Sequence, residues 1–117
     1  MPNESAYTAK LLRTIRRDHI NVTAIKLSER YVSGMPDFLI CTVGGSIAFF
    51  EAKVNNEPLT KLQTNLLTRF RGYIVRYFPK LKRYTLATHN GALIGTWGDL
   101  NDFAHELVVR TAIGRTS

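Results

Sequence analysis

The sequence contains a single cysteine and no long apolar run. Because Cys41 has no second thiol to pair with, an internal disulfide is excluded, and a thiol within an apolar strand is expected to pack as a small hydrophobic side chain. No apolar run approaches the roughly 20 residues needed to span a bilayer. The N-terminal residues are polar and lack the positive-then-apolar order of a signal peptide. We therefore expect a cytoplasmic location.

Motifs for several kinds of chemistry are also absent. The histidines are isolated in the sequence and do not have zinc-ligand spacing. The Gly44-Gly45 pair lacks the lysine and the following helix of a phosphate-binding loop, so it indicates a hairpin turn. No serine or cysteine nucleophile motif, internal repeat or low-complexity tract is present. These absences disfavour zinc, nucleotide-hydrolysing and covalent-nucleophile enzymes.

Basic residues exceed acidic residues by a wide margin. The 117 residues include 16 Lys and Arg against 9 Asp and Glu, which gives a net charge of +7 and favours a polyanionic partner. A ribosomal or membrane-surface protein can carry the same charge, so the charge alone does not identify the partner. A hydrophobic fraction of 44% at this length is that of one globular domain with its own core.

The pattern of apolar residues predicts an α/β fold in a single domain, residues 1–117. Apolar residues at helical spacing predict amphipathic helices, and short β-branched or aromatic runs bounded by turn residues predict strands. The expected helices cover residues 3–18, 60–71 and 100–110. The expected strands cover residues 22–27, 38–42, 47–53, 73–78, 84–89 and 92–97. The tail from residue 111 onward is expected to be frayed.

Acidic residues stand at the ends of two of these strands. Successive side chains on a strand point to opposite faces, so Glu51 and Lys53 share one face of the strand 47–53. Asp37 opens the preceding strand and is expected to lie opposite Glu51 across the hairpin. Two carboxylates there repel one another, and a divalent cation with hard oxygen ligands removes that repulsion. The pattern therefore predicts a metal site at Asp37 and Glu51, with Lys53 close to the same ion.

Each part of this pattern also has an ordinary explanation. Asp37 after Pro36 is a common turn sequence, and Glu51 with Lys53 is a common pair at the end of a strand. The combination of the two acids, the lysine and a hairpin of suitable length favours the metal site over coincidence.

This stretch resembles the PD-(D/E)xK nuclease superfamily, whose motif is matched position by position by Pro36, Asp37, Glu51 and Lys53. Through the segment Leu-Thr-Lys-Leu-Gln at 59–63, it is similar to the VRR-NUC group, whose small stand-alone viral and phage members resemble Holliday junction resolvases. The likeness covers about residues 4–78, but the chain has no Val-Arg-Arg string. It implies a restriction-endonuclease-like αβββαβ core with a mixed central sheet, followed by a C-terminal β-hairpin and helix. For a viral chain the expected location is the host cytoplasm.

The resemblance also implies a chemistry, namely hydrolysis of phosphodiester bonds with Mg²⁺ or Mn²⁺. Asp37, Glu51 and the backbone carbonyl of Ala52 are the implied oxygen ligands. Lys53 is implied to orient the attacking water or to stabilise charge that develops on the phosphoryl oxygens.

Two further polar residues have alternative explanations. Glu4 projects on nearly the same line of the first helix as Leu11 and Ile15, which puts an acid on the buried stripe. The resemblance implies that Glu4 joins the metal site, whereas the helix dipole alone also favours an acid at this end. Gln63 falls on the apolar side of the second helix, where it either forms a capping box with Thr60 or, as the resemblance implies, braces the catalytic site.

Basic and aromatic residues elsewhere suit contacts with a nucleic-acid backbone, which read shape and charge. In the loop 28–35, Arg30 and Tyr31 either contact nucleic acid near the metal or form a solvated loop. The full set of expected nucleic-acid-binding residues is Arg13, Arg17, Arg30, Tyr31, Lys61, Lys80, Lys82 and Arg83.

The expected partner is DNA, branched or duplex, and no organic cofactor is expected. A symmetric four-way junction needs two cuts, so a chain with one site is expected to act as a homodimer. Two other kinds of protein fit the same composition, namely a non-catalytic nucleic-acid-binding module on the same fold and a small basic ribonucleoprotein subunit. A nuclease of different DNA or RNA specificity is a further alternative.

Overall fold

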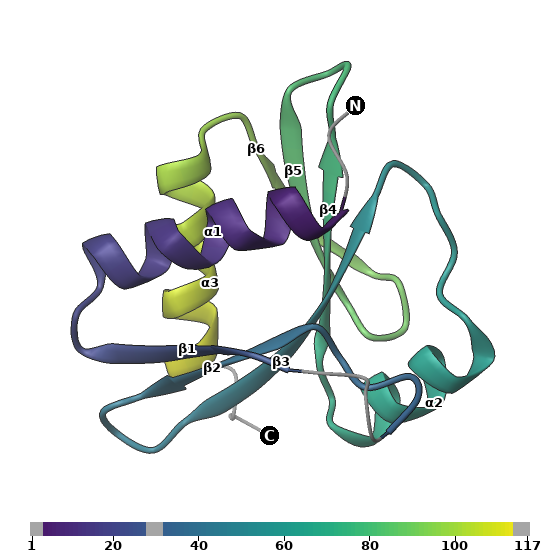
Figure 1. The fold of residues 1–117 in the computed structure, drawn as a ribbon, viewed down its shortest axis with the longest axis horizontal. Coiled ribbons are helices and arrows are strands. Elements are labelled where there is room, and N and C mark those ends of the chain that lie inside the picture. Colours follow the sequence, from purple (N-terminus) through teal and green to yellow (C-terminus); the bar gives the residue numbers. More distant parts are fainter. Residues whose placement is uncertain (1–3, 28–31, 114–117) are drawn as a thin grey trace.

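The computed structural model describes residues 4–27 and 32–113, and it confirms an α/β fold (Figure 1). The helices are α1 (Glu4–Asp18), α2 (Lys61–Arg69) and α3 (Leu100–Ile113). The strands are β1 (Val22–Lys26), β2 (Phe38–Thr42), β3 (Ile47–Val54), β4 (Tyr73–Phe78), β5 (Arg83–Thr88) and β6 (Leu93–Trp97). The sequence predicted this order of elements, namely a helix, three strands, a helix, a strand, a hairpin and a helix.

The strands form one six-stranded sheet in the order β1-β2-β3-β4-β5-β6. The β3–β4 pair is parallel and the other pairs are antiparallel, so the sheet is mixed. A parallel pair needs a crossover connection, which α2 and its flanking loops supply. The sheet twists strongly, so that β1 and β2 run across the direction of β4 and β5 (Figure 1). This arrangement is compatible with a restriction-endonuclease-like fold.

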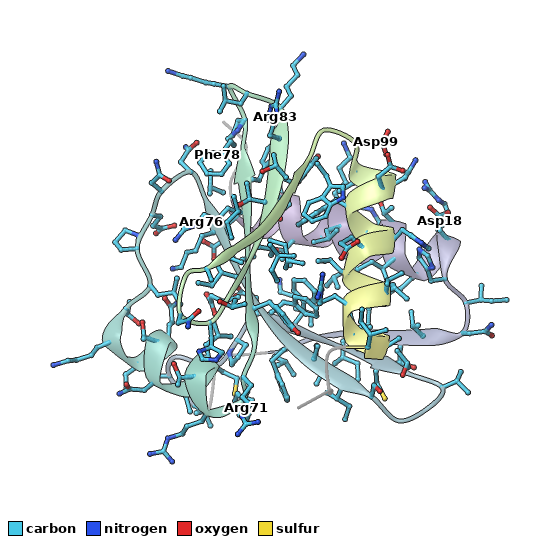
Figure 2. All side chains as sticks on the ribbon, turned by 180° about the vertical axis from the view of Figure 1, so that it is seen from behind. Asp18, Arg71, Arg76, Phe78, Arg83 and Asp99 are labelled. Carbon is cyan, nitrogen blue, oxygen red and sulfur yellow. The ribbon has the colours of Figure 1, made fainter. Side chains whose placement is uncertain are left out.

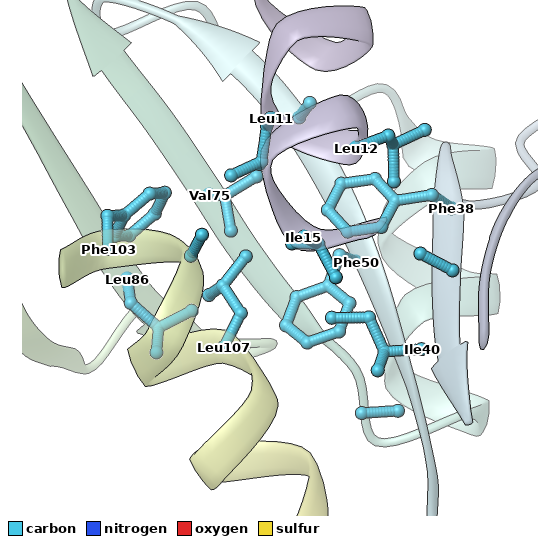
Figure 3. Close-up of a cluster of buried hydrophobic side chains, with 14 of the residues drawn as sticks. Leu11, Leu12, Ile15, Phe38, Ile40, Phe50, Val75, Leu86, Phe103 and Leu107 are labelled. Carbon is cyan, nitrogen blue, oxygen red and sulfur yellow. The ribbon is translucent and has the colours of Figure 1, made fainter. Parts of the chain in front are cut away.

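The hydrophobic core lies between the sheet and the pair α1 and α3. Along β3 the inward face carries Ala48, Phe50 and Ala52, all buried, as the period of two in a strand requires. The fully buried side chains drawn in Figure 3 include Leu11, Leu12, Ile15, Phe38, Ile40, Phe50, Val75, Leu86, Phe103 and Leu107. This packing fixes the direction of α1 relative to β3, and therefore fixes where the N-terminal end of α1 lies.

Helix α2 packs on the other face of the sheet. Its last-turn neighbour Phe70 stacks on Phe49 of β3 with ring centroids 4.3 Å apart. Phe49 alternates with the inward-facing Phe50, so α2 covers the face that also carries Glu51 and Lys53.

Two predicted helix ends were wrong. The last helix does not end at residue 110 but continues to Ile113, because Thr111 is only 1% exposed and its hydroxyl donates to the carbonyl of Leu107. The expected frayed tail is thus helical over 111–113. The second helix ends at Arg69, two residues earlier than predicted, since Arg71 adopts a left-handed φ of 53°. Within residues 4–27 and 32–113, no helix is both long and apolar enough to cross a membrane.

Candidate metal site

Asp37 is held by its neighbours on both sides. Its backbone N–H donates to the carbonyl of Phe50 at 2.9 Å, and its carbonyl accepts from the N–H of Leu27 at 2.8 Å. Its side chain accepts a third bond, from the backbone N–H of Ala52 to Oδ2 at 2.8 Å. The aspartate is therefore fixed by the main chain at the place where the β2–β3 ladder ends.

A glycine makes room for the approach to Asp37. Gly34 has a φ of +82°, and a Cβ built on it would lie 2.7 Å from the Cβ of Leu62 in α2. A larger residue here meets both backbone strain and a clash. Gly34 thus lets the segment that leads to Asp37 pack closely against the first turn of α2.

Glu51 lies beside Asp37, as the sequence predicted. Phe38 pairs with Phe50 in the register of β2 and β3, so the preceding Asp37 falls opposite Glu51. Glu51 is 1% exposed, and its Oε2 has no hydrogen-bond partner within the described part of the chain. Burial raises the pKa of Glu51 well above its usual range, and the charge and hydrogen bond of Asp37 raise the pKa further.

Glu4 completes a cluster of three acids. One carboxylate oxygen from each of Glu4, Asp37 and Glu51 lies within 4.8 Å of the others. Burial, followed by the charge of Asp37, raises the pKa of Glu4 to about 7. Glu4 thus stands in the first turn of α1, where the helix dipole favours an acid, and its carboxylate also lies near the strand acids. Its part in a metal site stays a prediction.

The cluster fits a divalent cation. Its donors are carboxylate oxygens, the hard ligands that Mg²⁺ and Mn²⁺ prefer. The unpartnered Oε2 of Glu51 is a buried acceptor whose desolvation a cation would offset. A cavity of about 30 Å³ opens beside Glu4 and Asp37, which is the space that one water or one ion occupies.

The backbone of Ala52 faces the same space. In a strand the N–H and C=O of one residue point to the same neighbour. Since the N–H of Ala52 is directed to the Asp37 carboxylate, its carbonyl points to the same side, beyond the end of β2. This orientation is consistent with the expectation that the carbonyl contributes a ligand oxygen.

Lys53 follows Glu51 on the same face of β3 and is only 4% exposed. Its charge lowers the pKa of both Glu4 and Glu51, which places the ammonium within electrostatic reach of both acids. A lysine buried to this degree is unusual unless it is paired with negative charge. The structure thus brings together four of the residues that the sequence singled out.

Gln63 caps the start of α2. Its Oε1 accepts from the N–H of Thr60 at 2.9 Å, and the hydroxyl of Thr60 accepts from the N–H of Gln63 at 3.1 Å. The capping box is therefore confirmed. The role of Gln63 in bracing the catalytic site stays a prediction.

The expected nucleic-acid-binding residues lie in separate places. Arg13 follows Glu4 by nine residues, roughly 13 Å of helix, and shares a groove on the outer face of α1 with Arg17. Arg17 also bonds Asp18. In Figure 2, Asp18 lies across the molecule from Arg76, a residue near the acidic cluster that is described below. Lys61 is exposed at the start of α2. Arg30 and Tyr31 lie outside the described residues.

The remaining basic residues are at the turn between β4 and β5. Lys80, Lys82 and Arg83 are exposed, and Figure 2 shows Arg83 at the projecting end of this hairpin. The hairpin and the N-terminal end of α1 lie on the same side of the molecule (Figure 1).

Sequence reasoning missed three charged residues near the cluster. Lys26 lines the small cavity with Glu4 and Asp37. Glu57 lies close enough to Glu4 to raise the pKa of that acid further. Arg76 donates through Nη1 to the carbonyls of Asn55 and Glu57 at 2.9 and 2.6 Å, and so holds the loop after β3.

Only one of these residues had a signal in the sequence. Arg76 is a lone charge inside the strand Tyr73–Phe78, and its direct pairing with Lys53 depends on the parallel register of β3 and β4. That register cannot be read from local patterns.

The fold and the site together define an α/β domain, compatible with a restriction-endonuclease-like fold, that carries a carboxylate cluster and a buried lysine at the end of its central strands. No protein-family model and no curated protein matches the chain. Among solved structures the chain is similar to a cryo-electron microscopy structure of a DrdV–DNA complex, with a TM-score of 0.50 and 17% identity. At that identity the likeness shows the fold alone. The match covers 95% of this chain and 12% of the other chain. Membership of the VRR-NUC group stays a prediction.

Proposed function

We propose that this chain is a metal-dependent endonuclease that hydrolyses phosphodiester bonds in DNA. The observation that carries the proposal is the convergence of Glu4, Asp37 and Glu51 around a buried, unpartnered carboxylate oxygen, with the ammonium of Lys53 close by. Structural ion-pair networks also gather charges, but an excess of acid in a buried cluster is costly unless a cation joins it. The net charge of +7 on the whole chain supports a polyanionic substrate.

In this proposal Asp37, Glu51 and the carbonyl of Ala52 hold Mg²⁺ or Mn²⁺, and Glu4 adds a further ligand. When bound, the cation supplies a Lewis acid that neutralises charge on the phosphate and activates water. Asp37 is already oriented by the amide of Ala52, so little reorganisation is needed for it to act as a ligand.

Lys53 has a different role from the acids. Its ammonium, fixed by burial on the same face as Glu51, orients the attacking water or stabilises the charge that develops on the phosphoryl oxygens. A compact cation is suited to this task. Gln63 braces the site from the first turn of α2, while its carbonyl oxygen caps that helix.

We further propose that cleavage is structure-selective, with four-way junctions as the preferred substrate and a homodimer as the active form. This part rests on the resemblance of residues 4–78 to small stand-alone nucleases of that kind. Contacts from the exposed Lys80, Lys82 and Arg83 would read the backbone, not the bases.

The test is a cleavage assay of the purified protein with Mg²⁺ or Mn²⁺. The substrates are a four-way junction, a flap, a nicked duplex, a plain duplex, single-stranded DNA and RNA of matched sequence. Paired symmetric cuts confined to the junction support the resolvase, while equal cutting of several DNA forms keeps the nuclease and discards the junction role. Cutting of RNA alone changes the substrate class.

Tight DNA binding without cleavage under either metal has another meaning. It would favour the non-catalytic nucleic-acid-binding module on the same fold, which the basic surface also supports.

A further inference from the structure

A second pocket lies between α1 and the strands β4 and β5, and three of the six residues that line it are tyrosines. Its volume is about 160 Å³, and it is lined by Ala6, Tyr7, Lys10, Tyr77, Tyr84 and Leu100. None of these residues takes part in the proposed hydrolysis.

The three tyrosines form one stacked group. The ring centroids of Tyr77 and Tyr84 are 5.0 Å apart, those of Tyr7 and Tyr77 are 5.3 Å apart, and those of Tyr7 and Tyr84 are 5.9 Å apart. Tyr84 stacks in turn on Phe103, which is fully buried in the core. The ring positions are therefore fixed before any ligand arrives, which lowers the entropy cost of stacking a further aromatic ring.

Tyr7, one of the residues that line this pocket, also carries an unused polar group. It is 6% exposed, and its hydroxyl has no hydrogen-bond partner within the part of the chain that the structure describes. Burial of Tyr7, followed by its neighbour Tyr84, raises the pKa of its hydroxyl far above the usual value, so the group stays a neutral donor and acceptor. A buried hydroxyl without a partner costs free energy, and a ligand with a carbonyl or amino group removes that cost.

The size of the pocket suits one six-membered ring. A cavity of about 150 Å³ in a protein core holds a single benzene ring. The pocket here is close to that volume, which matches a pyrimidine better than the fused rings of a purine. Lys10 supplies a cation at the same wall, as a nucleotide phosphate requires.

The pocket lies one helical turn along α1 from Glu4 of the acidic cluster. Tyr7 follows Glu4 by three residues on α1, so the two side chains are neighbours along one face. Tyr77 pairs with Val54, which alternates with Lys53 along β3, so the Tyr77 side chain lies on the α1 face of the sheet and not on the face of Lys53. A DNA strand that passes Glu4 at the end of α1 would have an adjacent nucleotide at the tyrosines.

We propose that this pocket binds one unpaired pyrimidine base of the DNA strand that lies across the acidic cluster, with the base stacked on the tyrosines, the Tyr7 hydroxyl bonded to its edge and Lys10 bonded to its phosphate. The strand's position rests on the proposed function, while base binding itself does not. Unpaired bases occur at branch points, flaps and bulges, so the pocket would give the enzyme its preference for distorted DNA.

The test measures binding in EDTA, so cleavage plays no part. Fluorescence anisotropy compares a labelled thymidine hexamer with an abasic hexamer of equal length and phosphate number, using the full chain. We expect the thymidine hexamer to bind roughly tenfold tighter or more, the effect of stacking one base on aromatic side chains. Equal affinities would overturn the proposal.

Three variants then locate the base. Tyr7→Phe keeps the ring and is expected to lower the thymidine-to-abasic ratio roughly two- to tenfold, the effect of one hydrogen bond. It should also melt at a higher temperature, since it deletes a buried hydroxyl without a partner, so misfolding cannot explain the loss. Tyr84→Leu is expected to bring the ratio close to one. Lys10→Gln is expected to weaken both hexamers equally.

The matched control is Tyr73→Phe on the same strand as Tyr77, because Tyr73 does not line the pocket. A ratio that is unchanged in both Tyr7→Phe and Tyr84→Leu would place the base elsewhere and overturn the proposal. Thymidine monophosphate that binds as tightly as the hexamer would point to a free-nucleotide site and overturn the assignment to a DNA strand.

The outcome is separable from that of the proposed function. A protein that cuts DNA but shows equal hexamer affinities keeps the nuclease and loses the base pocket. A protein that discriminates the hexamers but never cuts keeps the base pocket and loses the nuclease.

Discussion

The amide of Ala52 donates to Oδ2 of Asp37 across the end of the β2–β3 ladder, at 2.8 Å. Through this side chain, the bond continues the β2–β3 pairing one step beyond the end of the backbone ladder. It holds the Asp37 carboxylate next to that of Glu51 against their mutual repulsion. The metal ligands are thus positioned by the central strands themselves, which favours a site formed before any ligand binds.

Replacing Lys53 by methionine should separate cleavage from binding. Methionine fills a similar buried volume without the ammonium, so we expect the fold to persist and cleavage to fall by at least about a hundredfold. DNA affinity should change little, since most of it comes from phosphate contacts elsewhere. Affinity for Mn²⁺ should stay the same or increase, because a cation near the acids is removed. Cleavage at the wild-type rate by Lys53→Met would show that the lysine has no catalytic role.

The stability of the metal-free protein should fall as the pH rises. Glu4 has a pKa of about 7 in the folded chain against 4.5 for an unperturbed glutamate, and burial raises the pKa of Glu51 as well. Between the unfolded and folded pKa values the folded state holds more protons than the unfolded state. The stability that these two raised pKa values contribute is therefore fully present below pH 4.5. It is lost as the pH rises through 7 and beyond.

Thermal melts in EDTA from pH 5 to pH 9 check this prediction. The melting temperature should fall with pH, and Glu4→Gln should make the fall shallower. Mn²⁺ should restore stability most strongly at the high-pH end, where the acids are ionised. A melting temperature that rises steadily with pH in EDTA would contradict the proposed environment of both acids.

The sequence predicted the strand acids better than their surroundings. Period-two alternation and the Gly44-Gly45 turn are local signals, and they suffice to place Asp37 opposite Glu51 with Lys53 on the same face. Helical periodicity likewise predicted that Glu4 lies on the buried side of the first helix. The effect of Glu57 on Glu4 depends on where the loop after β3 packs. That position depends in turn on the parallel pairing of β3 with β4, whose residues are over 20 positions apart in the sequence. The tyrosine pocket is hidden for the same reason, because it joins α1, β4 and β5.

Arg76 should affect cleavage although it is neither one of the acids nor a metal ligand. Its two bonds to the carbonyls of Asn55 and Glu57 keep the loop over the cluster. Arg76→Met should release this loop and lower kcat about ten- to hundredfold, as small misplacements of catalytic groups do. Hydrogen exchange at residues 55–57 should become faster at the same time.

The matched control for Arg76→Met is Arg69→Met, at the exposed end of α2. It removes the same charge from the protein without touching the loop. Equal loss of activity in the two variants would indicate that only net charge matters.

The β4–β5 hairpin should contribute to DNA affinity and not to the chemical step. The double variant Lys80→Gln with Lys82→Gln removes two phosphate contacts, so the slope of log affinity against log salt should shrink by about 1.8. The control is Arg69→Gln with Arg71→Gln. Each pair contains one residue with a left-handed backbone, Lys82 at a φ of 51° and Arg71 at 53°, so the backbone strain is comparable. A control that changes the slope as much would show that binding follows overall charge.

The most direct test of the account is calorimetric titration of Mn²⁺ into the wild-type protein and into Asp37→Asn. The asparagine keeps an oxygen that can accept from Ala52 but loses the negative charge, and Asp102→Asn on the exposed face of α3 is the matched control. We predict saturable binding to the wild type and to Asp102→Asn, weakened at least roughly tenfold in Asp37→Asn. If all three proteins bound Mn²⁺ alike, or none bound it even with DNA present, Glu4, Asp37 and Glu51 would not form a metal site.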